Sequence, residues 1–243
     1  MGLSEKERLF QKYYDRLIME ALHARAHLNL WERFEKYKAT SYIDELNQAR
    51  YFFNFTIKAH LDDVLVTLSR ILDRHKEALS IWKFLSFAEK NREIFSTQAF
   101  NQRMIKKPDY DKYWAESHKP ITLKEIEEDR QKLGSLEQTV NNLTAWRNKV
   151  VAHIDRQFLL SDKIVSEEYP MQLQQLQEVV TTLFPILNRY SGAYNSSSYA
   201  TSYPGEDDVQ FVMDCIRFYI EEHNRQIEAE LEALKRQKSM GNK

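Results

Sequence analysis

Residues 57–72, which read IKAHLDDVLVTLSRIL, carry the apolar pattern that decides the fold. Their large apolar side chains recur at intervals of three and four residues, as one face of an α-helix requires, whereas a strand would show strict alternation. The members of this stripe are Ile57, Leu61, Val64, Leu65, Leu68, Ile71 and Leu72. The segment therefore predicts a helix with one buried face.

The chain around this segment lacks the residues that most often interrupt regular structure. Neither glycine nor proline occurs between Gly2 and Pro108, and the whole chain of 243 residues has only five of each. An all-β sandwich or barrel would need a turn about every 8–12 residues, so this composition argues against that class. Long helices are predicted instead, and Ser4 with Glu7 forms a capping box that would open the first one.

The other helices are predicted from capping residues, prolines and apolar spacing. The predicted helices span about 4–37, 40–75, 122–154, 170–190 and 207–235, with shorter helical pieces over 80–104. Thr122 with Glu125 forms a second capping box. Pro170 suits the first turn of a helix, and Pro185 should kink that helix.

These elements predict an all-α fold, an antiparallel helical bundle with an inserted region and a long C-terminal helix. Residues 1–227 would form a single domain, and 228–243 would be a charged tail that frays. The insertion at about 101–120 mixes aromatic and basic residues, which would either stack on single-stranded RNA or pack on the bundle. Residues 191–206 are rich in Ser and Tyr and are predicted to form a flexible loop.

Composition excludes several classes of protein and site. The single cysteine, Cys215, is predicted to lie in the core and excludes an intrachain disulfide or a thiolate zinc site. With 35 basic and 36 acidic residues, the chain needs a local site to hold any polyanion. The charged N-terminus does not resemble a signal peptide, and no apolar run approaches the roughly 18 residues of a membrane span. A cytoplasmic protein with no membrane partner is therefore expected.

Histidine spacings raise the question of a metal site. Glu20 and His23 have the Glu-x-x-His spacing of di-iron bundles, and His23 with His27 has the i, i+4 spacing of a metal pair. A di-iron site needs a second Glu-x-x-His helix, which the sequence lacks, and Glu116 with His118 has the wrong spacing. The sequence therefore predicts neither a metal ion nor a cofactor.

Position 147 interrupts the apolar stripe of the helix predicted over 122–154. An arginine stands there, and a buried guanidinium is costly unless it is paired, so Asp62 or Asp63 is a candidate partner across the bundle. On an α-helix Arg147 and His153 would border the apolar arc about 9 Å apart along the axis. The same pattern would also fit an ordinary core or rim residue with its hydrogen bonds satisfied.

The order Arg147, Asn148 and, after four more residues, His153 resembles the signature of HEPN domains. The Ile-Asp pair that follows the histidine and the earlier stretch 59–73 are similar to the abortive-infection type U branch of that superfamily. The resemblance spans about 37–219 and implies a four-helix core that dimerises around the motif helices. It also implies, in many members, a metal-independent endoribonuclease.

The resemblance assigns roles to individual residues. His153 would be the general acid or base, Arg147 would stabilise charge on the phosphorus, and Asn148 would orient the histidine or bind phosphate. The expected products are a 2′,3′-cyclic phosphate and a 5′-hydroxyl end. Lys149 and Arg156 would hold flanking phosphates, unless they are ordinary surface charges.

Asp62, Asp63 and Asp155 would support the site, by pairing with the motif residues or in a purely structural role. The leading functional hypothesis is a homodimeric endoribonuclease that acts on RNA in phage defence or as a toxin, with an antitoxin or other regulatory partner. A non-catalytic HEPN module that binds RNA or a protein is the first alternative. The second is a helical adaptor whose charged final helix is the interaction surface.

Overall fold

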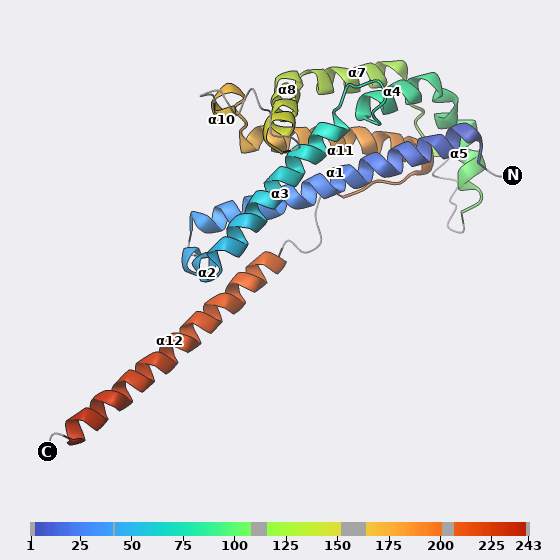
Figure 1. Cartoon of the computed structure of the whole chain (residues 1–243). Helices are drawn as coiled ribbons and strands as arrows, with labels where there is room; N and C mark the ends of the chain where they lie inside the picture. Colours follow the sequence, from blue (N-terminus) through green and yellow to red (C-terminus); the bar gives the residue numbers. More distant parts are fainter. Residues whose placement is uncertain (1–2, 41, 108–115, 152–163, 201–206, 242–243) are drawn as a thin grey trace. The chain divides into compact units, whose positions relative to one another are not determined.

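The computed structural model describes residues 3–40, 42–107, 116–151, 164–200 and 207–241 (Figure 1). Every regular element in these ranges is helical and none is a strand, which confirms the predicted all-α class. The elements are α1 (Glu5–Lys38), α2 (Ile43–Gln48), α3 (Arg50–Ile71), α4 (Ile81–Lys90), η1 (Arg92–Phe95), α5 (Thr97–Met104), α7 (Leu123–Gly134), α8 (Glu137–Trp146), η2 (Arg147–Val151), α10 (Val165–Glu168), α11 (Leu173–Asn195) and α12 (Asp208–Gly241). Within the described ranges, no helix is both long enough and apolar enough to cross a membrane.

The chain divides into two compact units, and α1 and α3 each contribute residues to both. The first unit comprises Met1–Leu28 and Leu61–Tyr203, and the second unit comprises Asn29–His60 and Pro204–Lys243. The helix α12 crosses residue 227 without a break. No change in secondary structure marks residue 228, and the charged tail predicted to begin there stays a prediction.

Aromatic side chains from helices distant in sequence build the core of the first unit. The ring centroid of Phe10 on α1 lies 5.1 Å from that of Phe95 and 4.6 Å from that of Tyr194. Phe84 on α4 packs edge to face on Tyr190 of α11, with centroids 5.0 Å apart. All five rings are buried, and such pairs contribute beyond the apolar area that they bury. The helix α4 also lies beside α7 (Figure 1).

The apolar stripe that predicted α3 is buried almost throughout. All its members are buried except Leu61, which is half-buried. Thr67 and Ser69, on the same stretch of the helix, are buried as well. The prediction of a helix with one buried face is confirmed.

The second unit has a smaller core that draws only on the first turns of α12. Its members are Phe34, Tyr37, Tyr42, Leu46, Phe53, Ile57, Val209 and Met213. The Tyr42 hydroxyl donates to Asp214 at 2.8 Å, and Arg217 pairs with Glu45 at 2.5 Å. Cys215 faces away from this core and is exposed, so the prediction that it is buried was wrong.

Both predicted capping boxes are present. The Glu7 backbone N–H donates to Ser4 Oγ at 3.2 Å, and the Ser4 backbone N–H donates back to the Glu7 carboxylate at 2.8 Å. Thr122 and Glu125 make the same two bonds at 3.2 and 2.8 Å. These bonds satisfy N–H groups that a helix start leaves without partners, and they fix where α1 and α7 begin.

Two of the predicted helices are each divided. The helix predicted over 40–75 is α2 and α3, because α2 ends at Gln48 and α3 begins at Arg50. The helix predicted over 122–154 breaks after Gly134, a residue whose low helix propensity favours an end there. Apolar periodicity continued across both breaks, which explains why it did not reveal them.

Prolines define the ends of α11 less closely than predicted. The helix begins at Leu173, so Pro170 precedes the first turn instead of forming it. It continues through Pro185 to Asn195, and the predicted loop 191–206 therefore begins with helical residues. A helix can contain a proline when neighbouring packing compensates for the lost hydrogen bond.

Candidate functional site

The helix α8 leads into the predicted motif, and three hydrogen bonds fix its C-terminal part. The buried Ser69 hydroxyl on α3 shares its proton between the Leu65 carbonyl of its own helix at 2.5 Å and the Leu143 carbonyl at 3.3 Å. Asn142 Nδ2 donates to the Pro170 carbonyl at 2.7 Å, and Trp146 Nε1 donates to the Tyr169 carbonyl at 2.8 Å. The motif therefore starts from a helix that is anchored to α3 and to the segment before α11.

Arg147–Val151 forms a π-helical turn directly after α8. The predicted separation of about 9 Å between Arg147 and His153 was for an α-helix. A π turn closes i→i+5 hydrogen bonds and changes both the rise and the angle per residue over 147–151, and His153 itself lies outside the described residues. Single π turns occur frequently at functional sites.

Arg147 is half-buried, and two neighbours hold its guanidinium. Its side chain is 23% exposed; Nη1 lies 3.3 Å from Asp73 Oδ2, and Nε donates to Asn148 Oδ1 at 3.0 Å. Asp73 thus takes the place that was predicted for Asp62 or Asp63. Among the described residues, these contacts of the guanidinium are made by Nη1 and Nε.

The partner Asp73 follows the end of α3 and is itself positioned by the backbone. Its Oδ1 accepts a hydrogen bond from the His75 backbone N–H at 2.8 Å, while Oδ2 faces Arg147. Asp73 is the last residue of the stretch 59–73 that carries part of the family resemblance. Its position there was the one signal in the sequence that pointed to it.

The two residues after Arg147 have different surroundings. Asn148 is exposed, and its amide oxygen accepts a hydrogen bond from Arg147. The Lys149 ammonium lies 5.8 Å from the centroid of the Tyr169 ring, within the range of a cation–π contact. Lys149 therefore has a structural partner at the site where phosphate binding was predicted.

Three predicted site residues lie outside the described residues. They are His153, Asp155 and Arg156, and residues 108–115 of the predicted insertion are outside as well. The roles that the resemblance assigns to these residues stay predictions.

Asp63, predicted to support Arg147 or His153, lies instead beside two histidines of α1. Its Oδ2 is 3.3 Å from His27 Nδ1 and 3.7 Å from His23 Nδ1, and the two imidazole centroids are 4.4 Å apart. The Thr67 hydroxyl donates to the same Oδ2 at 3.4 Å. In the described part of the chain, these are the three residues that gather potential metal-ligating atoms, all within 4.8 Å of one another.

Burial and the neighbouring charges act on His27 in opposite directions. Burial lowers the pKa of the His27 imidazole, and the nearby His23 lowers it further, whereas the Asp63 carboxylate raises it. The net pKa is below the ordinary value, so the neutral imidazole is favoured.

Glu20, the acidic residue of the Glu-x-x-His spacing on α1, forms ion pairs with Arg16 and with Arg70, the latter at 2.7 Å.

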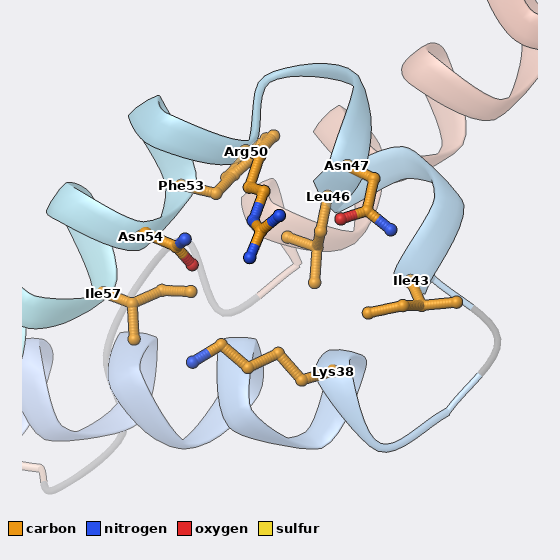
Figure 2. A pocket seen from close by; sticks show the side chains of 8 residues that line it. All are labelled: Lys38, Ile43, Leu46, Asn47, Arg50, Phe53, Asn54 and Ile57. Carbon is orange, nitrogen blue, oxygen red and sulfur yellow. The ribbon is translucent and has the colours of Figure 1, made fainter.

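The second unit has an open pocket of about 360 Å³. Its lining residues are Lys38, Ile43, Leu46, Asn47, Arg50, Phe53, Asn54 and Ile57. Figure 2 shows the Arg50 guanidinium and the Lys38 side chain extending into the same hollow, from α3 and α1 respectively. This pocket was not predicted from the sequence, because its polar residues form no pattern along the chain.

Comparison with known families places these features in context. The model of the HEPN family described as AbiU2 matches residues 9–214, a range that includes Asp63, Asp73 and the whole Arg–His motif. No curated protein and no solved structure gives a significant match. The helical fold agrees with the family match, and the resemblance seen in the sequence is confirmed. The chain belongs to the AbiU2 family of HEPN proteins.

Proposed function

We propose that this HEPN protein is an endoribonuclease that needs no metal ion for cleavage. The supporting observation is the Arg147 guanidinium, which is half-buried on a π turn and oriented by Asp73 and Asn148. A planar guanidinium with a fixed orientation presents a fork of N–H donors that suits a phosphate group. Family membership supports this reading, because HEPN domains are often ribonucleases.

In the proposed reaction the ribose 2′-hydroxyl attacks the adjacent phosphorus and the 5′-oxygen leaves. His153 accepts the proton of the attacking hydroxyl or donates one to the leaving oxygen, since an unperturbed imidazole has a pKa of about 6.5. Arg147 stabilises the negative charge of the pentacoordinate phosphorane. The products carry a 2′,3′-cyclic phosphate and a 5′-hydroxyl, and DNA is left intact because it lacks the 2′-hydroxyl.

The proposal includes a homodimer formed through the motif helix. Two copies would bring two arginines and two histidines to one phosphodiester, with Lys149 and Arg156 near the flanking phosphates. The RNA substrate and the reducing conditions suited to a single cysteine imply a cytoplasmic setting. There the activity would serve phage defence or act as a toxin, held in check by an antitoxin or other regulatory partner.

One observation favours the alternative of a non-catalytic HEPN module. Arg147 already has a carboxylate partner in Asp73, so an incoming phosphate must compete with that carboxylate for the guanidinium. A purely structural ion pair would leave the protein able to bind RNA or a partner without cutting. The adaptor alternative rests on α12, most of which is exposed.

The test is incubation of the purified protein with total RNA in EDTA, followed by sequencing of the cleavage ends. We expect wild-type protein to leave 2′,3′-cyclic phosphates, and the variants Arg147→Ala and His153→Ala to leave RNA intact. Arg130→Ala is the matched control, because Arg130 is also half-buried, at 27% exposed, and pairs with Glu89 at 2.5 Å. This control should cleave like wild type.

Two results would contradict the proposed nuclease activity. One is cleavage by His153→Ala that equals wild type. The other is a wild-type protein that binds RNA and cuts none of it, which would support the non-catalytic module. Deletion of residues 228–243 followed by a partner-binding measurement tests the adaptor separately.

A further inference from the structure

We propose that His23, His27 and Asp63 form a binding site for one divalent transition-metal ion, with zinc as the reference ion. Two imidazole nitrogens and one carboxylate oxygen are a ligand set that zinc commonly accepts in proteins. No metal was predicted here because the sequence has no second Glu-x-x-His helix to match the one in α1. The structure supplies the third ligand from α3 instead.

The distances between the ligand atoms suit a single ion. Ligands about 2.0–2.1 Å from a tetrahedral zinc ion lie about 3.3–3.4 Å from one another. Asp63 Oδ2 lies 3.3 Å from His27 Nδ1 and 3.7 Å from His23 Nδ1. All three ligand atoms lie within 4.8 Å of one another, so side-chain rotations that draw the two imidazoles together would place them around one centre.

The helices provide this arrangement without strain. His23 and His27 are one turn apart on α1, so their side chains lie on the same face. Asp63 belongs to α3 and reaches the histidines across the packed helices. A metal bound here would join two helices whose residues are about 40 positions apart in the chain.

Neighbouring residues orient the carboxylate in the way that outer groups orient metal ligands. The Thr67 hydroxyl donates to Asp63 Oδ2 at 3.4 Å, and Arg70 Nη2 donates to Thr67 Oγ1 at 3.2 Å. Arg70 is in turn held by Glu20 at 2.7 Å, which offsets its positive charge beside a cation site. The ligand oxygen is thus the end of an ordered chain of polar contacts.

The exposure of the ligands is also suitable. Side-chain exposure is 54% for His23, 24% for His27 and 31% for Asp63, so an ion can enter from solvent. A water molecule or a fourth ligand can complete the coordination.

This site is separate from the proposed nuclease residues. Asp63 lies eight residues before the end of α3, about 12 Å along the helix axis, whereas Asp73 lies beyond that end. The inference therefore does not rest on the proposed function. Cleavage of RNA in EDTA and metal binding by the stripped protein can succeed or fail independently.

The test uses full-length protein stripped with EDTA, in a Cys215→Ser background because that thiol is exposed and could bind zinc. Isothermal titration calorimetry with zinc chloride should give one site per chain, and cobalt(II) should give the visible absorption of a low-coordinate nitrogen and oxygen site. We expect His27→Gln and Asp63→Asn each to weaken zinc binding at least tenfold. The double variant His23→Gln/His27→Gln should lose the site.

His75→Gln is the matched control, because it removes an exposed histidine outside the cluster and should leave zinc affinity unchanged. Circular dichroism establishes that each variant is folded. Added zinc should raise the thermal unfolding midpoint of the background protein and not that of the double variant. The site is refuted if the background protein binds neither zinc nor cobalt, or if the folded double variant binds zinc as tightly as the background does.

Discussion

The turn after α8 and the histidine cluster on α1 and α3 assemble their side chains in different ways. At the turn, Arg147 and Asn148 are adjacent in the chain, and one distant residue, Asp73, completes the group. At the cluster, a pair spaced i, i+4 meets a carboxylate from another helix. In both places the local residues were visible as a pattern, whereas Asp73 was not named as a partner and Asp63 was assigned to the Arg–His motif instead of to the histidines of α1. Local spacing reveals residue types, whereas packing between helices selects the partner.

The largest expected difference between the two regions concerns RNA cleavage. Arg147→Lys should lower the cleavage rate by about 10–100-fold, because an ammonium keeps the charge and loses the planar fork of donors. Asp63→Asn should leave the rate within about twofold of wild type, since the cluster takes no part in the proposed chemistry. Initial rates on a defined RNA in EDTA measure both. Equal losses in the two variants would show that the regions act together.

A smaller difference is expected in stability at the turn. Asp73→Ala removes both the ion pair with Arg147 and the bond from the His75 backbone N–H, and should lower the free energy of unfolding by about 1 kcal/mol. Arg147→Ala removes the ion pair and the bond from Nε to the exposed Asn148, and should cost about half as much because both contacts are partly solvated. Urea denaturation measures both values.

Glu137→Ala serves as the control for that comparison, because its exposed carboxylate lies 3.7 Å from Arg74 and should contribute almost nothing. A larger loss of stability in Arg147→Ala than in Asp73→Ala would mean that Asp73 is not the residue that organises the turn.

The smallest expected effect is a pH dependence at the cluster. The pKa of His27 is lowered in the folded protein, so the unfolded chain binds its proton first as the pH falls below about 6.5. Metal-free protein should therefore lose a little stability as the pH falls from about 6.5 towards the lower folded pKa. In His27→Gln this part of the slope should be absent. Thermal unfolding at several pH values in EDTA measures it, and an unchanged slope in the variant would contradict the assignment.

The features that the sequence predicted correctly are those set by neighbours within one or two helical turns. The apolar stripe of α3 and the capping boxes at Ser4 and Thr122 are of this kind. The π turn at Arg147 was not predicted, because no residue preference distinguishes it from an α-helical turn. The partners of Asp63 and Asp73 were not predicted, because an aspartate on α3 or just after it can face any helix that packs nearby. Asp63 and Asp73 lie on one segment of chain and serve different groups.

The C-terminal helix α12 extends well beyond the core that its first turns help to form. Beyond its contacts with the second-unit core, α12 continues to Gly241 through residues such as Glu, Ala, Leu, Lys and Arg, which are strong helix formers. The pairs Glu222–Arg225 and Glu232–Arg236 add local support along its surface. Such a segment behaves as a semi-rigid spacer of about 1.5 Å per residue instead of a slack tether. Residue 241 therefore lies about 50 Å from residue 208, and a molecule bound at residue 241 would be kept about that far from the start of the helix.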